Sequence, residues 1–363
     1  MTTTDILSQR LVNQQIVATT LKKPEALVAW MGAMQAQEYA MAKWAIGLRL
    51  PGSNDISVEK AFNEGAILRT HILRPTWHFV TPADIRWIVT LTAPRVRASL
   101  RYMDRKLGLD AATINRGLAA LEKILAGGKQ LVRDEISTAL GHAKIKAIGQ
   151  YLGNLLMHAE LAMLVCSGPR RGKNFTYTLL DERVPITPAL GHDESLAKLA
   201  NRYFSSRGPA TLQDFCWWAS LTIKEAQRAV SSLDNQLGRE TISGQEFYFA
   251  SNSPQTATKL TTSFLMPDYD EYGIAYKNRA ILFDQSIRNE PVLAYNRMVI
   301  VNGLILGTWK RESAATTVQI EIAPFTPITR TQRQAIEQAT ERYATFLGVK
   351  PELRFREANN KEQ

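Results

Sequence analysis

The sequence predicts an α+β protein in which a group of helices followed by two short strands occurs three times before a β-rich C-terminal region. Helical periodicity and strand-like pairs alternate over residues 1–253, and alternating apolar runs follow Pro254. The 363 residues suggest two or three domains, and the 45% content of hydrophobic residues is sufficient for their cores.

The first group spans residues 1–105. Its expected helices and strands lie at residues 5–20, 24–37, 57–65, 66–72 and 77–81. Pro24 suits the first turn of a helix because its missing N–H would have no partner there. Gly65 terminates a helix, and Arg74-Pro75 forms the turn between the two strands. The group therefore ends in a hairpin with a basic tip.

The second group spans residues 106–190 and has the same order of expected elements. Gly127-Gly128 interrupts its helical pattern, and two further helices follow before a hairpin. The tip of this hairpin is a Gly/Pro-rich turn that carries Arg170, Arg171 and Lys173.

The third group spans residues 191–253 and shows the clearest signals. Thr222 and Glu225 are spaced as a capping box at the start of a helix. A hairpin is expected to turn at Ser243-Gly244.

The remaining residues, 254–363, are expected to form the β-rich region. Asn302-Gly303 between two apolar runs predicts a two-residue hairpin turn. A closing helix is expected over residues 331–347.

A helical group followed by a basic-tipped hairpin is the layout of a winged helix-turn-helix. In this fold one helix enters the major groove, and the hairpin contacts phosphates or the minor groove. Lys and Arg suit that contact because the counterions that they displace favour binding. One charged turn alone is more often a solvated loop, but several such hairpins favour DNA binding. Winged helices also dock onto proteins, so that alternative stays open.

Charge supports the same interpretation without deciding it. The chain carries 44 Lys and Arg against 34 Asp and Glu, a formal net charge of +10 and a pI near 9.6. This excess fits a polyanionic partner, although a basic protein without such a partner fits equally well. Cys166 and Cys216 lack CxxC spacing and are expected as buried thiols in a reducing cytosol. No secretion signal or membrane span is recognisable, so we expect a soluble cytoplasmic protein.

Common catalytic and cofactor motifs are absent from the sequence. It contains no GxxxxGK(S/T), no GxGxxG after a strand, no HExxH and no GxSxG. The five histidines lack the spacing of metal ligands: His71, His78, His142, His158 and His192. We therefore expect no metal site and no organic cofactor.

The acidic segment PDYDEY contains three carboxylates, Asp268, Asp270 and Glu271. Paired carboxylates can act as general acid and base. The alternative, which we favour, is that they form salt bridges and fix the β region to its neighbours. The basic residues expected as their partners are Lys277, Arg279 or Arg297.

Gln35 and Gln37 stand one alanine apart in an otherwise helix-friendly run. An amide has no proton to gain or lose near neutral pH, so neither can be a general base. It can hold a water by hydrogen bonds and direct a carbonyl dipole at developing positive charge. That is sufficient when the leaving group is already cationic, as a purine alkylated at N7 or N3 is. From the residues alone, two glutamines that simply face water remain the alternative.

Backbone geometry restricts where these glutamines can lie. Residues two apart on a regular helix diverge by roughly 200°. Gln35 and Gln37 can face one site only if they lie at a helix end or at a distortion.

Five segments of the chain resemble the AlkZ-like winged-helix DNA glycosylases, which are named for self-resistance to the crosslinker azinomycin. The segments are MGAMQAQEYAMAKWAIGLR, RTHILRPTWHFVTPADIRWIVTLTAPR, LVCSGPRRGKNFTYTLLDERVP, LMPDYDEYGIAYKNR and VNGLILGTWKR. The likeness runs across nearly the whole chain, and the segments together are specific to the family.

The resemblance implies three tandem winged-helix units in a C-shape around DNA, followed by a barrel-like β region. It also implies a monofunctional glycosylase that hydrolyses the N-glycosidic bond of bulky N7-alkylpurines and unhooks interstrand crosslinks in DNA repair. The implied partner is double-stranded DNA with alkylated purines, and we expect a nucleoid-associated monomer without a protein partner.

The resemblance also assigns roles to particular residues. Gln35 and Gln37 match the Gln-apolar-Gln segment that carries the catalytic residues of the family, and Gln37 places the chain in its Gln-Gln branch. The expected DNA-binding residues lie in the hairpins and are Arg69, Arg74, His78, Arg170, Arg171, Lys173, Asn302, Lys310 and Arg311.

Two other functional classes compete with the glycosylase. A non-enzymatic winged-helix DNA-binding protein or transcriptional regulator would share the hairpins, although regulators usually dimerise on paired half-sites. A protein-docking scaffold is the third interpretation. Release of the base from alkylated DNA would separate the enzyme from both.

Overall fold

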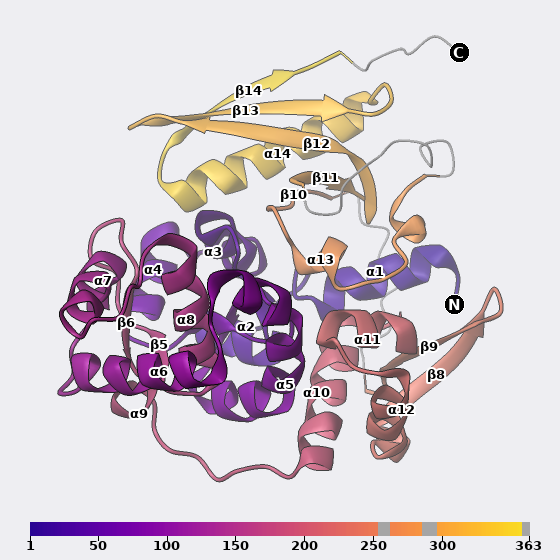
Figure 1. The fold of residues 1–363 in the computed structure, drawn as a ribbon. Coiled ribbons are helices and arrows are strands. Elements are labelled where there is room, and N and C mark those ends of the chain that lie inside the picture. The colour runs from indigo at the N-terminus through magenta and orange to yellow at the C-terminus, as the bar shows by residue number, and fades with distance from the viewer. Residues whose placement is uncertain (253–261, 285–295, 358–363) are drawn as a thin grey trace. The chain divides into compact units, whose positions relative to one another are not determined.

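The computed structural model describes residues 1–252, 262–284 and 296–357 (Figure 1). Within these residues the chain forms two compact units. Unit 1 comprises Met1–Glu59 and Ala200–Gln363, and unit 2 comprises Lys60–Leu199. The expected division into residues 1–105, 106–190, 191–253 and 254–363 follows the order of the repeats, whereas the two units follow packing, so this division stays a prediction.

The first group of elements runs from the N-terminus to a long helix. It comprises α1 (Thr3–Asn13), α2 (Pro24–Met31), β1 (Met34–Gln35), α3 (Tyr39–Arg49), α4 (Asp55–Asn63), β2 (Leu68–His71), β3 (Trp77–Val80) and α5 (Pro82–Leu107). The expected β2–β3 hairpin is confirmed, with antiparallel pairing from Leu68 opposite Val80 to His71 opposite Trp77.

The second group repeats the order helix, strand, two helices and two strands. It comprises α6 (Ala111–Leu125), β4 (Leu131–Val132), α7 (Arg133–His142), α8 (Gly149–Leu161), β5 (Val165–Ser167), β6 (Thr176–Leu179) and α9 (Leu180–Arg183). In its sheet the strand order is β4-β6-β5, so the first strand pairs with the last. Leucine side chains of α6, α7 and α8 form the buried core of this group.

The third group has the same order and the same strand arrangement, β7-β9-β8. It comprises α10 (His192–Arg207), β7 (Ala210–Thr211), α11 (Leu212–Ala219), α12 (Ile223–Ser231), a 3-10 turn (Asp234–Gln236), β8 (Leu237–Ile242) and β9 (Gln245–Ala250). The Thr222 capping box and the hairpin turn at Ser243-Gly244 are both confirmed. The expected triple repeat of element order is therefore present.

The C-terminal region is confirmed as β-rich. It comprises β10 (Ser263–Leu265), α13 (Glu271–Ile274), a 3-10 turn (Ala280–Leu282), β11 (Met298–Val301), β12 (Leu304–Ser313), β13 (Thr317–Pro324), α14 (Arg330–Leu347) and β14 (Lys350–Phe355). The strands of its described residues form one sheet in the order β10-β11-β12-β13-β14, and α14 lies against one face of this sheet (Figure 1). The closing helix is confirmed, whereas the parallel strand β14 after it was not expected.

The sheet also holds α3, the helix that follows the glutamine segment. The indole N–H of Trp44 donates to the carbonyl oxygen of Leu265, at 2.7 Å. The same ring lies 4.9 Å from that of Tyr343 and 5.3 Å from that of Phe346 on α14. These contacts fix the position of α3 on the C-terminal region.

Two expected helices of the first group are too long. The helix expected at 5–20 ends at Asn13, and the helix expected at 24–37 ends at Met31. The second ends there because Gly32 adopts φ +71°, which a residue inside a right-handed helix cannot have. Among the described residues, no helix is both long and apolar enough to cross a bilayer.

We predict that Gly47→Ala lowers the free energy of unfolding by about 1–3 kcal/mol. A Cβ atom on Gly47 of α3 would lie 2.3 Å from the buried ring of Phe346, so the ring or the helix has to move. Thermal unfolding followed by circular dichroism measures the change. Gly141→Ala is the matched control, since Gly141 lies on α7 with no atom near its Cβ position. Unchanged stability of Gly47→Ala would contradict the close packing of α3 on α14.

Candidate functional site

The segment that carries the two glutamines is not helical. Gln35 is the second residue of the two-residue strand β1, and Gln37 lies in the turn before α3 begins at Tyr39. The Gln35 residue is 9% exposed, whereas Gln37 is exposed. The helix expected over residues 24–37 would have included both glutamines, but α2 ends at Met31, so both lie in the connection between α2 and α3.

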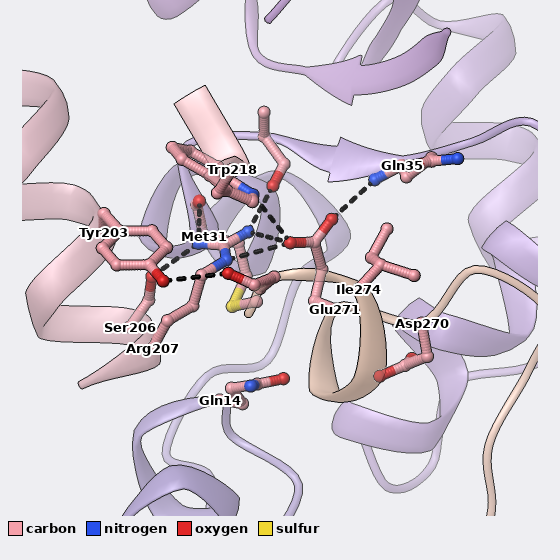
Figure 2. Close-up of polar contacts among 12 residues, drawn as sticks. Gln14, Met31, Gln35, Tyr203, Ser206, Arg207, Trp218, Asp270, Glu271 and Ile274 are labelled. Atoms are coloured by element: carbon pink, nitrogen blue, oxygen red, sulfur yellow. Dashed lines mark hydrogen bonds and ion pairs between the residues drawn. The ribbon is translucent and has the colours of Figure 1, made fainter. Parts of the chain in front are cut away.

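A buried carboxylate holds the backbone at Gln35. The Gln35 N–H donates to Oε1 of Glu271, at 2.9 Å, and Glu271 begins the short helix α13 (Figure 2). The Gln35 side chain extends away from this carboxylate. Glu271 therefore contacts the peptide group of Gln35, and the side-chain amide of Gln35 points away from this carboxylate.

Arg207, at the end of α10, neutralises the same carboxylate. Its Nε and Nη2 donate to Oε2 of Glu271, at 2.9 and 2.7 Å, and the indole N–H of Trp218 donates to that oxygen at 2.9 Å. Both members of the ion pair are buried, with Arg207 fully inaccessible and Glu271 2% exposed. A charge at such depth requires its partner.

Arg207 also holds the chain immediately before Gln35. Its Nη1 donates to the carbonyl oxygen of Met31 and its Nη2 to that of Ala33, each at 2.7 Å. These carbonyl groups flank Gly32, where the chain leaves α2 and turns into β1. Arg207 and Glu271 together therefore bind residues 31, 33 and 35 of one short segment (Figure 2).

A second buried ion pair holds the helix after the glutamines. Nη1 and Nη2 of Arg49, the last residue of α3, donate to the two oxygens of Asp270 at 2.8 and 2.9 Å. The side-chain oxygen of Gln14 accepts a further bond from the guanidinium, at 2.9 Å. Neighbouring residues Asp270 and Glu271 thus take one buried arginine each from different helices.

The carboxylates of PDYDEY were expected either to act as general acid and base or to form salt bridges, and all three form ion pairs. Asp268 pairs with Arg297 at 2.8 Å, as expected. The other two partners were predicted wrongly, because Asp270 and Glu271 bind arginines far away in the sequence rather than Lys277 or Arg279. The favoured interpretation, that the carboxylates fix the β region to its neighbours, holds with these corrected partners.

Three tyrosines around this cluster are confined to the neutral form. Burial raises the pKa of Tyr203, of Tyr272 and of Tyr276 above the usual value. The hydroxyl of Tyr276 donates to the carbonyl oxygen of Arg207, at 2.8 Å, and that of Tyr203 donates to Ala275, at 2.9 Å. The phenols of Tyr276 and Tyr203 thus act as neutral hydrogen-bond donors to the ends of α10 and α13.

The β2–β3 hairpin places its expected DNA-binding residues differently. Arg69 is buried, with its guanidinium 4.2 Å from the ring centre of Trp77 and 4.6 Å from that of Phe175. His78 is fully buried, and its Nδ1 donates to the carbonyl oxygen of Thr76. Arg74 is half-exposed in the turn between the strands. DNA contact by these residues stays a prediction. Arg74 is the most accessible of the three, because Arg69 and His78 are buried.

The second hairpin presents its cations in the turn between β5 and β6. Arg171 is exposed and pairs with Glu135 at 2.6 Å, and Lys173 is exposed as well. Arg170 is half-buried, with its guanidinium 4.6 Å from the ring centre of Phe175. Lys173 and Arg171 therefore meet solvent, while Arg170 packs against the hairpin.

The β11–β12 hairpin has a rigid tip. Asn302 and Gly303 both have positive φ, +53° and +84°, as a two-residue turn of this type requires. The hydroxyl of Tyr272 donates to the carbonyl oxygen of Gly303 at 2.7 Å, and Asn302 remains exposed. Further along β12, Lys310 is exposed and Arg311 donates to the hydroxyl of Tyr343.

Acidic and histidine side chains do not gather as metal ligands in the part of the chain that is described. No group of three or more His, Cys, Asp or Glu residues there could hold a metal ion. His71 and His158 instead pair singly with Glu160 and Asp104. Both cysteines are free thiols, and burial raises the pKa of Cys166 to about 12.

Sequence reasoning did not find Arg49, Arg207 and Trp218 as parts of the site. Each lies within an ordinary amphipathic helix, and Arg207 is separated from Gln35 by more than 170 positions. The segment PDYDEY was the one signal that pointed to this cluster, since its carboxylates were expected to form salt bridges that fix the β region to its neighbours.

Comparisons with known proteins agree with this architecture. Residues 28–346 match the family described as DNA glycosylase AlkZ-like. The interstrand DNA cross-link repair glycosylase of Streptomyces sahachiroi is 22% identical over 361 residues, which cover 95% of this chain and 96% of that protein. The solved structure of Streptomyces sahachiroi DNA glycosylase AlkZ shares the fold, with a TM-score of 0.81, 19% identity and coverage of 98% of this chain and all of that one.

The family match spans most of the chain, so the class of protein follows from it: this is a DNA glycosylase, and DNA is its substrate. The chain belongs to the AlkZ-like DNA glycosylase family. The expected family and enzyme class are therefore confirmed, and the non-enzymatic regulator and the docking scaffold are set aside.

We predict that Asp270→Asn lowers the free energy of unfolding by about 3–5 kcal/mol, because the buried guanidinium of Arg49 loses its counter-charge. Equilibrium denaturation with urea measures the difference. Asp268→Asn is the matched control on the same segment, since its pair with Arg297 is partly exposed and is worth less than about 1 kcal/mol. Equal losses in the two variants would contradict the structural role of the buried pair.

Proposed function

We propose that this DNA glycosylase hydrolyses the N-glycosidic bond of bulky cationic alkylpurines of the N7-alkylguanine type and unhooks interstrand crosslinks. The name of the Streptomyces sahachiroi relative, an interstrand DNA cross-link repair glycosylase, supports the second part. The observation that carries the first part is a fixed, non-helical segment, residues 32–37, with two amides and no titratable side chain.

The chemistry of an alkylated purine matches such a segment. N7 alkylation makes the base cationic, so the base can leave without being protonated. The bond between C1′ and the base nitrogen breaks, its electron pair neutralises the purine, and the sugar becomes an oxocarbenium-like cation. The oxygen of a water then bonds to C1′ and the water releases one proton to solvent.

Gln35 and Gln37 would act in this reaction as neutral dipoles. A carbonyl oxygen directed at the sugar stabilises the positive charge that develops there, and an amide hydrogen-bonds the attacking water. Their value depends on position rather than on proton affinity, because a preorganised dipole needs no rearrangement during the reaction. The fixed backbone at Gln35 fits that requirement.

The carboxylates of PDYDEY are poorly suited to act as acid or base instead. Asp268, Asp270 and Glu271 each pair with an arginine at 2.7–2.8 Å. A base that took a proton at one of these positions would leave a buried or half-buried guanidinium without its partner. We therefore assign the reaction to the amides.

We propose that the three repeats are winged-helix units that bind double-stranded DNA. The order helix, strand, two helices and two strands recurs, and the first strand pairs with the last in the sheets β4-β6-β5 and β7-β9-β8. Exposed Lys173 and Asn302 at hairpin tips would contact the backbone or a groove. With a net charge of +10, we further propose a monomer that acts at the cytoplasmic nucleoid.

We predict that Gln35→Ala and Gln37→Ala each lower the rate of base release about 10²–10³-fold, the usual loss when one preorganised dipole is removed. Single-turnover release from duplex DNA with one N7-methylguanine measures the rate. Gln334→Ala, an exposed glutamine on α14, is the control and should keep the wild-type rate. Wild-type rates in both site variants would contradict the catalytic role assigned to Gln35 and Gln37.

A neutral isostere tests the need for a cationic leaving group. 7-Methyl-7-deazaguanine has the shape of N7-methylguanine but carries no positive charge, so we predict that the enzyme binds duplexes with either base and releases only N7-methylguanine. Comparable release of both bases would contradict the proposed chemistry.

We predict that Lys173→Ala lowers the slope of log affinity against log salt concentration by about one unit, because one phosphate contact is lost. Fluorescence anisotropy with undamaged duplex at several salt concentrations measures the slope. Lys350→Ala, on β14 and outside the basic hairpins, should leave it unchanged. An unchanged slope for Lys173→Ala would show that this hairpin does not bind phosphate.

A further inference from the structure

We propose that Glu271 is a positioning residue for base release and acts on Gln35 through the backbone N–H of that residue. This inference rests on the proposed function, in which the Gln35 amide stabilises the reacting sugar. Glu271 does not touch DNA or the attacking water. It sets where the peptide group of Gln35 lies, and thereby the direction in which the side chain leaves the strand.

The carboxylate is used on both of its oxygens. Oε1 accepts the N–H of Gln35, while Oε2 accepts three N–H groups, two from Arg207 and one from Trp218 (Figure 2). A carboxylate bound in this way cannot rotate without breaking a charge-assisted bond. The position of Oε1, and with it the position of the Gln35 backbone, is therefore fixed.

Arg207 is held as firmly as the carboxylate. Beyond its bonds to the carbonyl groups of Met31 and Ala33, its Nη1 donates to the hydroxyl of Ser206 at 2.7 Å. Its guanidinium carbon lies 4.3 Å from the ring centre of Trp218. The same pair of charges thus binds residues 31, 33 and 35 in succession, so the segment cannot slide by one residue without losing these bonds.

The segment that carries Gln35 depends on contacts from other elements because it has little regular structure of its own. The strand β1 has two residues, and Gly32 before it has the conformational freedom of glycine. An amide that works as an oriented dipole is sensitive to displacement, and a misplacement of about 1 Å can cost about 10²-fold in rate. The buried carboxylate removes that freedom.

The test is the rate of base release by Glu271→Gln, measured under single-turnover conditions with saturating enzyme on duplex DNA that holds one N7-methylguanine. A glutamine side chain has one acceptor oxygen, so it cannot serve Gln35 and Arg207 at once. We expect the rate to fall about 10–100-fold, with the Kd for the same duplex within about twofold of wild type. Asp268→Asn, three residues earlier, is the matched control and should keep both values.

A double-mutant cycle with Gln35→Ala separates positioning from a general structural effect. If Glu271 acts through Gln35, adding Glu271→Gln to Gln35→Ala lowers the rate no further. An unchanged rate in Glu271→Gln alone, or the same loss in both backgrounds, would overturn the proposal. A wild-type rate of base release in Gln35→Ala alone would instead refute the proposed function, so the two failures are distinguishable.

Trp218→Phe provides the same cycle if Glu271→Gln does not fold. This variant keeps the charge pair and removes one donor from Oε2. We expect a smaller fall in rate that is again absent in the Gln35→Ala background. No fall, or an equal fall in both backgrounds, would overturn the proposal.

Discussion

The buried ion pair between Arg207 and Glu271 is the interaction on which the rest of the site depends. Two opposite charges without access to water are stable only when every donor and acceptor is used, and here the spare hydrogen bonds go to the segment that carries Gln35. The ion pair therefore converts a short connection between α2 and α3 into a defined structure. A connection that solvent alone supported would sample many conformations.

The neighbouring pair of Arg49 and Asp270 extends this arrangement to the other side of the glutamines. Arg49 closes α3, so the helix that follows Gln37 is bound to the same short acidic segment as the strand that contains Gln35. Trp44 and Gly47 add the packing of α3 on the C-terminal region. Chemistry that depends on neutral amides has no proton transfer to adjust, so its efficiency depends on this rigidity.

Local signals in the sequence predicted much of the fold and little of the support of the site. The capping box at Thr222 and the turn at Asn302-Gly303 are encoded within a few residues, and both were predicted correctly. The conformation of Gln35 was predicted wrongly, because the helix expected over residues 24–37 ends at Met31. The angle between helical residues excluded only a regular helix in which both glutamines face one site. The partners of Asp270 and Glu271 were missed because each buried ion pair joins residues that are distant in sequence. No local sequence pattern indicates which arginine pairs with which carboxylate.

The most direct measurement of the central claim is the hydrogen-exchange rate of the Gln35 backbone amide in the native wild-type protein. The account predicts slow exchange, comparable with that of amides inside α3, because a buried carboxylate accepts this N–H in a segment bound on both sides. Exchange as fast as in an unstructured peptide would contradict it, since the Gln35 N–H would then not be held by the Glu271 carboxylate.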